Sequence, residues 1–223
     1  MKHLVALRLT GPWELKSLDL PDHKPRIRKP WLRNEVAKVI KAVKPKIGPH
    51  SSPGGILKAK HTADELRFIL YCGFHAGLRR REISMARINW FDLDASLLHV
   101  SNDSGFTSKD TENRVVPLTK EFLEFLRTYT KGMRGQDFAL QPERLPGVWK
   151  YRYDFKRLVE GHFKKCGVVS DLHGMRRSFA SNLVSDGVSI YKVAQWLGDG
   201  VEVVEGHYGY LAPQDQDIDR LVS

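Results

Sequence analysis

The sequence predicts an α+β domain that is mostly α-helical and carries a small antiparallel sheet. Apolar residues recur at helical spacing in several separate stretches, for example at Leu66, Ile69 and Leu70. Two short segments, residues 97–100 and 114–118, have an extended pattern and are joined by a polar stretch that suits a long hairpin connection. The chain has 223 residues, which is enough to bury a substantial core.

The N-terminal part of the chain is predicted to have little regular structure before its first helix. Residues 1–30 are interpreted as a linker or arm, because prolines interrupt any helix there: Pro12, Pro21, Pro25 and Pro30. A helix is expected from about Leu32 to Val43, and Pro45 ends it. Residues 48–55 have the composition of a loop.

The middle of the chain is predicted to hold a longer helix and the hairpin. The helix has Thr62 as its candidate N-cap and ends at Gly77. The two strand candidates follow, with residues 101–113 as the polar connection between them.

Further helices are expected after the hairpin. One begins at Thr119 and contains Phe122, and a second runs from Phe155 to Cys166. The remainder is predicted to be a series of short helices separated by Gly187, Gly198 and Gly206. There are no internal repeats, so residues 31–213 are expected to form one domain, followed by a tail at residues 214–223.

Composition limits the classes of function. Cys72 and Cys166 make no disulfide framework, so a cytoplasmic, reducing setting is expected. The histidines show no metal-binding spacing, which argues against a structural metal. No apolar run approaches the length of a membrane span, and the first residues have too short an apolar core for a signal peptide.

The charge of the chain favours a polyanionic partner, and nucleic acid before a membrane surface. Thirty-six Lys and Arg residues against 26 Asp and Glu residues give a formal net charge of +10. The segment from Lys24 to Lys60 contains only one acid, Glu35. This segment is either a strip that follows DNA phosphates, with Lys58 and Lys60 as contacts, or a solvated helix face with a flexible loop.

Two basic clusters are candidates for phosphate binding. Arg79, Arg80 and Arg81 follow the helix-ending Gly77, and their planar guanidinium groups match phosphate oxygens. The alternative is a basic turn that faces solvent. Lys109 lies in the hairpin connection, where it can reach into a groove and donate a proton, or be merely solvated.

Two further clusters lie near the C-terminus. His173 and Arg176 are three residues apart and share a helix face, with Arg177 beside them. An imidazole there can exchange a proton near neutral pH. Leu-Gly-Asp, ending at Asp199, precedes Tyr208 and Tyr210, but a lone tyrosine is far more often a packing or surface residue than a nucleophile.

Taken in order, these clusters resemble the catalytic domain of the tyrosine recombinases, or phage-type integrases. The resemblance runs from about Leu32 to Pro213 and rests on five short motifs. These are an Arg after Gly-Leu, a hairpin Lys before Arg-Val-Val-Pro-Leu, His-x-x-Arg, Leu-Gly-x and then Tyr. It implies the recombinase catalytic fold over residues 31–213.

The resemblance assigns a role to each matching residue. Arg79 and Arg176 match the catalytic arginines, and Glu82 matches the acidic residue that supports them. Tyr208 matches the nucleophile that takes the 3′ phosphate and frees a 5′ hydroxyl. Its position after Leu-Gly-x favours it over Tyr210.

Two residues are assigned to proton transfer. Lys109 matches the usual general acid for the leaving 5′ oxygen, and His173 matches the histidine of His-x-x-Arg. The implied reaction is site-specific recombination or integration of double-stranded DNA through a phosphotyrosine, without metal, ATP or other cofactor. The resemblance also implies self-association on DNA in a tetrameric synapse, to which residues 214–223 contribute as a possible protomer-exchange helix.

Asp199 departs from the family pattern, which usually has His or Trp after Leu-Gly. A carboxylate repels a phosphate unless it is protonated or paired with an arginine. One alternative is therefore a weakened or inactive DNA-binding relic of the same fold. A second is an activity like that of type IB topoisomerases, which share the Arg, Lys, His and Tyr chemistry. Because residues 1–30 leave no room for an N-terminal helical domain, a catalytic-domain fragment or a shortened protein is expected.

Overall fold

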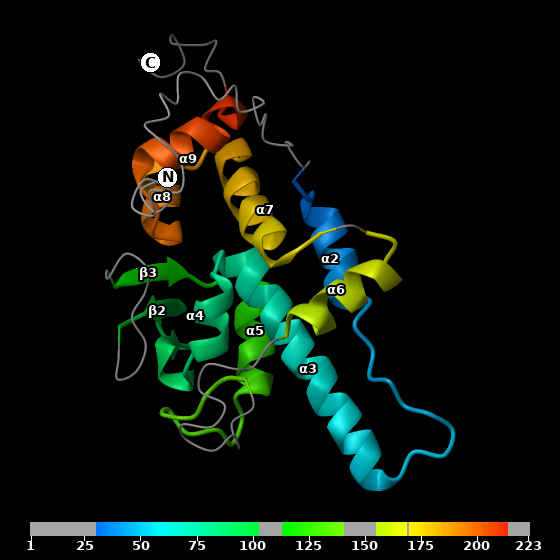
Figure 1. The fold of residues 1–223 in the computed structure, drawn as a ribbon. Helices are drawn as coiled ribbons and strands as arrows, with labels where there is room; N and C mark the ends of the chain where they lie inside the picture. The colour runs from blue at the N-terminus through cyan, green and yellow to red at the C-terminus, as the bar shows by residue number, and fades with distance from the viewer. Residues whose placement is uncertain (1–29, 103–112, 141–154, 169, 214–223) are drawn as a thin grey trace, which may run out of the picture.

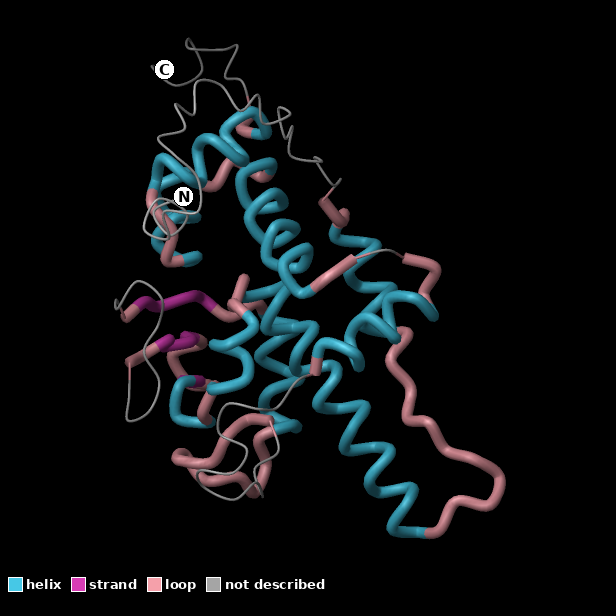
Figure 2. The backbone as a smooth tube through the Cα atoms, in the orientation of Figure 1, coloured by secondary structure: helices cyan, strands magenta, loops and turns pink. Residues whose placement is uncertain are grey.

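The computed structural model describes residues 30–102, 113–140, 155–168 and 170–213. Helices make up most of this part, and the strands form one edge of it (Figures 1 and 2). The helices are α2 (Arg33–Lys41), α3 (Pro53–Ala76), α4 (Arg80–Met85), α5 (Lys120–Tyr129), α6 (Lys156–Lys165), α7 (Leu172–Ser185), α8 (Ile190–Leu197) and α9 (Val201–Tyr208). The strands are β1 (Phe91–Asp92), β2 (Leu97–Val100) and β3 (Arg114–Pro117), and short 3₁₀ turns span Ile88–Trp90 and Gly209–Leu211.

The sheet has the predicted antiparallel hairpin at its centre. Its strand order is β1-β2-β3, and Leu98 of β2 pairs with both Phe91 of β1 and Val116 of β3. The predicted strands at 97–100 and 114–118 are confirmed to within one residue. β1 was not expected, because two residues are too few to show a period in the sequence.

The start of α3 corrects one prediction. Residues 53–55 belong to the helix rather than to a loop, and Thr62 lies inside it, where its hydroxyl donates to the Lys58 carbonyl. Ser52 is the N-cap and accepts a hydrogen bond from the Gly55 amide, with Pro53 in the first helical position. Proline is tolerated there because the first amides of a helix have no partner inside it.

The ends of the C-terminal helices confirm two predicted breaks and correct a third. Gly187 and Gly198 follow helices with φ of 82° and 63°, a left-handed conformation that glycine adopts without strain. Gly206, in contrast, lies inside α9. A glycine weakens a helix but does not have to end it.

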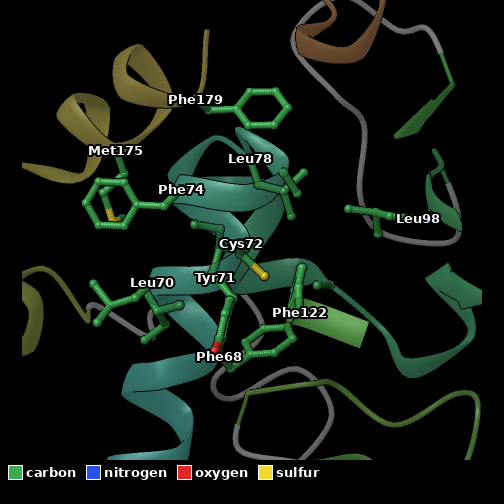
Figure 3. Close-up of a cluster of buried hydrophobic side chains, with 14 of the residues drawn as sticks. Phe68, Leu70, Tyr71, Cys72, Phe74, Leu78, Leu98, Phe122, Met175 and Phe179 are labelled. Atoms are coloured by element: carbon green, nitrogen blue, oxygen red, sulfur yellow. The ribbon is translucent and has the colours of Figure 1, made fainter. Parts of the chain in front are cut away.

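The C-terminal half of α3 forms the centre of the core. Figure 3 shows its side chains between Met175 and Phe179 of α7 on one side and Phe122 and Leu98 on the other. Phe68 is fully buried and stacks on Tyr129 with ring centroids 5.1 Å apart. The first turns of α3, in contrast, are mostly exposed and extend away from the other helices (Figure 1). The packing of α3 therefore fixes α7 and the sheet relative to each other.

α3 and α7 approach closely at Gly73. A Cβ atom on Gly73 would lie 2.6 Å from Met175 Cε and 2.8 Å from Met175 Cβ. Because Met175 is fully buried, its side chain has no free space into which to move. The approach of these two helices thus requires a residue without a side chain.

A buried ion pair joins α4 to β3. Arg114 donates from Nη1 to Glu82 Oε1 at 2.8 Å and from Nη2 to Glu82 Oε2 at 2.6 Å. The two side chains are 4% and 2% exposed, so neither charge has water as an alternative partner.

We expect Gly73→Ala to lower the free energy of unfolding. Overpacking of a core costs about 1–3 kcal/mol, which exceeds the gain in helix propensity of about 1 kcal/mol. Urea denaturation measures the change. Gly161→Ala on α6 is the matched control, because its Cβ would meet nothing within 4 Å, and it should be neutral or stabilising. Equal effects of the two substitutions would contradict this account of the helix crossing.

We also expect Arg114→Met to destabilise the fold by about 3–5 kcal/mol, because it leaves the Glu82 carboxylate buried without its partner. The control is Arg134→Met, which removes an ion pair to Asp137 whose arginine side chain is 75% exposed. That change should cost less than about 1 kcal/mol. Similar losses in the two variants, measured by urea denaturation, would show that the Glu82–Arg114 pair has no special role.

Candidate active site

Arg79 is held at the junction of α3 and α4. Gly77 ends α3 with φ of 61°, and a Cβ there would lie 2.5 Å from the Phe179 ring, so both the backbone and the packing require glycine. Arg79 then caps α4, and its backbone amide donates to Glu82 Oε2 at 2.7 Å. Its side chain is 22% exposed and lies between α4 and the end of α8: Nη1 is 3.5 Å from Glu82 Oε1, and Nη2 donates to the Gly198 carbonyl at 2.7 Å. Glu82 thus contacts both Arg79 and Arg114.

α7 carries the next two predicted residues. Asp171 caps this helix by accepting a hydrogen bond from the Gly174 amide at 2.6 Å. His173 lies on the first turn and is exposed, whereas Arg176, one turn later, is 4% exposed. Arg176 Nη1 donates to the carbonyl of Gly77 at 2.6 Å, so α7 is joined directly to the α3–α4 junction.

The C-terminal end of α8 brings these elements together. The last carbonyl groups of a helix have no partner within the helix and carry partial negative charge, which suits a cationic donor. Three successive carbonyls here each accept from a different arginine. Trp196 accepts from Arg114 Nε at 2.9 Å, Leu197 from Arg176 Nη2 at 2.8 Å, and Gly198 from Arg79 Nη2 at 2.7 Å.

Asp199 lies between the two predicted catalytic arginines. Its Oδ1 accepts from Arg79 Nη2 at 2.6 Å, and its Oδ2 accepts from Arg176 Nη2 at 2.7 Å. The sequence left open whether this carboxylate is protonated or paired with an arginine, and it is paired with two. Burial alone would raise the pKa of Asp199, but the charges and hydrogen bonds of Arg176 and Arg79 bring it below its ordinary value.

The surroundings of His173 favour the neutral form of its imidazole. Desolvation by surrounding protein atoms lowers the pKa of its imidazole from 6.5, and the positive charges of Arg177 and Arg176 lower it further. Asp171 and Asp199 act in the opposite direction but do not reverse the shift. A neutral imidazole has one nitrogen free to accept a proton.

Tyr208 is the last residue of α9 and is half-buried against the core. Burial raises the pKa of its phenol above 10.0, against the lowering effect of the nearby charges of Arg176 and Arg177. The phenol is therefore protonated at neutral pH and needs a base before it can attack. Tyr210, on the following turn, is 66% exposed.

Two clefts meet at Arg79. One, of about 660 Å³, is lined by His99, Asn113, Arg114, Asp199 and others beside the sheet. The other, of about 490 Å³, is lined by His173 and Arg176 of α7 together with Arg80. Arg79 therefore faces open space on both sides, where an extended ligand has access to it.

The predicted DNA-contact residues are exposed or half-buried, and Lys109 is not among the described residues. Arg80 and Arg81 are exposed on α4, Lys58 and Lys60 are exposed on the projecting part of α3, and Arg177 is half-buried with Asp171 3.5 Å away. Lys109 lies outside the described residues, as do most of residues 1–30 and all of 214–223.

Arg114 is the residue that sequence reasoning missed. It belongs to the Arg-Val-Val-Pro-Leu segment, which served only to locate Lys109. Buried and exposed residues alternate along β3, and Arg114 is on the buried side. A buried arginine requires an ionic partner, and this was the signal that could have identified it.

Among the described residues, no group of three or more His, Cys, Asp or Glu side chains is placed to hold a metal ion. None of the described helices is both long and apolar enough to cross a membrane.

Comparison with known proteins identifies relatives. The chain is 29% identical over 212 residues to the tyrosine recombinase XerA of Pyrococcus horikoshii, covering 89% of this chain and 70% of the relative. It is 28% identical over 141 residues to the XerA of Thermococcus kodakarensis, covering 59% of this chain and 46% of that protein. The chain thus spans about half to two thirds of the length of these relatives.

Solved structures share the fold at low identity. The crystal structure of XerA recombinase matches with a TM-score of 0.60 and 18% identity, covering 90% of this chain and 64% of that one. The Tn1549 transposon integrase in complex with transposon right end DNA matches with a TM-score of 0.63 and 14% identity, covering 92% and 69%. These likenesses confirm the predicted fold.

The model of the phage integrase family matches residues 55–200, well over half of the chain. That span contains both arginines, Glu82, His173 and Asp199, and it ends before Tyr208. The chain belongs to the phage integrase family.

Proposed function

We propose that this chain is the catalytic part of a site-specific recombinase that cuts and rejoins double-stranded DNA through a 3′-phosphotyrosine at Tyr208. Residues 31–213 form its catalytic domain. The family membership and the names of the relatives, tyrosine recombinases and integrases, support the reaction class. The neighbouring Tn1549 transposon integrase was solved in complex with transposon right end DNA and with circular intermediate DNA, which supports DNA as the substrate.

The observation that carries the proposal is the convergence of Arg79 and Arg176 on one carboxylate. Their Nη2 atoms lie 2.6 and 2.7 Å from the two oxygens of Asp199, so both guanidinium groups can donate to a single anion. Attack on a phosphodiester develops negative charge on its non-bridging oxygens. Donors fixed around that charge stabilise the transition state, and this is usually the largest single contribution to catalysis.

Proton transfer completes the proposed chemistry. Tyr208 Oη attacks the phosphorus atom, its proton passes to neutral His173, and the bond from phosphorus to the 5′ oxygen breaks. Lys109, in the β2–β3 connection, gives its proton to the departing 5′ oxygen. The phosphotyrosine conserves the bond energy, so rejoining by reversal requires no ATP. The arginines supply the positive charge, so the proposal requires no metal or other cofactor.

The same assignment implies contacts to DNA outside the site and assembly of several protomers on the DNA. We assign Arg80, Arg81 and Arg177 as phosphate contacts, and Lys58 and Lys60 as further phosphate contacts on the projecting part of α3. We propose that protomers assemble on DNA as a tetrameric synapse, with residues 214–223 exchanged between them. The reaction takes place in the cytoplasm, where the DNA is.

Asp199 favours a second candidate, a DNA-binding protein of the same fold that no longer cleaves. A carboxylate paired with both arginines is what an inactive site would contain. This candidate predicts DNA binding that weakens as salt is raised, with no covalent product at any protein concentration.

We expect the protein to form a covalent adduct with nicked duplexes taken from the DNA that flanks its own gene. The adduct should be visible on denaturing gels and absent in Tyr208→Phe, because the phenol oxygen is the nucleophile. Tyr210→Phe is the matched control and should retain the adduct. An adduct that persists in Tyr208→Phe would contradict the assignment of Tyr208 as the nucleophile. Salt-sensitive DNA binding without any adduct would favour the inactive candidate.

We expect kcat/KM for cleavage to rise with pH through a midpoint below 6.5, since the reaction needs neutral His173 and the pKa of its imidazole is lowered. Arg177→Gln removes a positive charge that opposes protonation of His173, so the pKa and the midpoint should both move to higher pH. Arg81→Gln, the control, should change the rate without moving the midpoint. If Arg177→Gln leaves the midpoint unchanged, the rise of kcat/KM with pH reports the titration of a group other than His173.

A further inference from the structure

Asp199 uses one donor of each catalytic arginine. The Nη2 atom of Arg79 donates to Asp199 Oδ1 and to the Gly198 carbonyl, and the Nη2 atom of Arg176 donates to Asp199 Oδ2 and to the Leu197 carbonyl. Each Nη2 has two hydrogens, so both are occupied. The carboxylate thus occupies the donors that point to a common acceptor.

A carboxylate and a phosphate present similar pairs of acceptor oxygens to guanidinium groups. The carboxylate of Asp199 is ionised, so it offers no proton to a phosphate and repels it. A phosphate and this carboxylate therefore compete for the same two donors.

We propose that Asp199 sets the phosphate affinity of this site by acting as an internal substitute for the scissile phosphate, which must displace it. This inference rests on the proposed function, since it takes the arginine pair as the place where the scissile phosphate binds. Asp199 is a specificity-determining residue: it disfavours weakly held anions and leaves the site to a phosphate that DNA contacts elsewhere hold in place.

The arginines do not depend on Asp199 for their positions. Arg176 also donates to the carbonyls of Gly77 and Leu197, and Arg79 also donates to the carbonyl of Gly198. These bonds remain when the carboxylate leaves. Removal of Asp199 is therefore expected to free two donors already aimed at one point, rather than to scatter them.

The carboxylate has space into which it can move. Asp199 is flanked by Gly198 and Gly200, its side chain is 27% exposed, and it lines the cleft of about 660 Å³ beside the sheet. Its backbone amide is held by the Ala194 carbonyl at 3.1 Å. The side chain therefore has open space beside it into which it can rotate while the backbone stays in place.

The test is titration of the whole chain with inorganic phosphate at pH 7 and constant ionic strength, followed by calorimetry. We expect Asp199→Asn to bind phosphate roughly tenfold or more tightly than the unmodified protein, because one repelling charge in contact with the anion is gone. Asp199→Glu keeps the carboxylate and should keep the weak affinity. Asp94→Asn makes the same change in charge in the exposed β1–β2 turn and should alter nothing.

Asp199→His is the second variant, in case Asp199→Asn does not fold, and circular dichroism establishes which variants are folded. It carries the residue that the family usually has here and should also bind phosphate more tightly. Phosphate affinity that is unchanged or weaker in the folded variants that lack the carboxylate would overturn the proposal. Weaker binding would mean that Asp199 organises the arginines instead of competing for them.

Cleavage of the nicked duplexes separates this inference from the proposed function. If both hold, Asp199→Asn lowers KM more than it changes kcat. Tighter phosphate binding by Asp199→Asn without a Tyr208 adduct in any variant would support the competition and overturn the recombinase function. If the Tyr208 adduct forms, but the unmodified protein and Asp199→Asn have equal phosphate affinity and equal KM, the recombinase function is supported and the competition between Asp199 and phosphate is overturned.

Discussion

The site depends on the C-terminal end of α8, where three arginines from distant parts of the chain meet three successive carbonyls. Arg79 comes from the α3–α4 junction, Arg114 from the sheet and Arg176 from α7. A helix end offers unpaired carbonyls of partial negative charge, and a guanidinium group offers several donors in one plane. One helix terminus thus brings together the arginines of three elements whose overall arrangement is set by their packing on α3.

Charge balance explains why so many arginines can lie close together. Arg176 is almost fully buried, and burial lowers the pKa of its guanidinium, whereas the neighbouring Asp199 raises it. Arg114 has Glu82, and Arg79 has contacts with both acids. Two carboxylates among three arginines leave an excess of positive charge, and an excess of this kind suits an anion that enters from the clefts.

The local elements that carry the predicted site residues were easier to predict from the sequence than the contacts of those residues. The spacing of His173 and Arg176 placed both on one helix, and the left-handed Gly77 and Gly198 were readable as helix ends. The predicted helix start at Thr119 is confirmed, since Thr119 is the N-cap of α5. Thr62 is not an N-cap, because α3 begins earlier, at Pro53, with Ser52 as its N-cap.

The contacts that matter most join residues far apart in the chain. Asp199 lies 120 positions from Arg79 in the sequence, and Arg114 lies 32 positions from Glu82. Neither pair can therefore be predicted from a local sequence pattern. The sequence indicated only that a carboxylate after Leu-Gly needs a partner. Which partner it has, and that it has two, depends on how α3, α7 and α8 pack.

The most direct test is a crystal structure of the Tyr208→Phe protein bound to a DNA duplex that the unmodified protein cleaves. The account predicts that one backbone phosphate accepts hydrogen bonds from both Arg79 and Arg176, with the Asp199 carboxylate turned away and the aromatic ring at position 208 facing that phosphate. A structure in which Asp199 still bridges the two arginines, with the DNA backbone bound elsewhere, would contradict it.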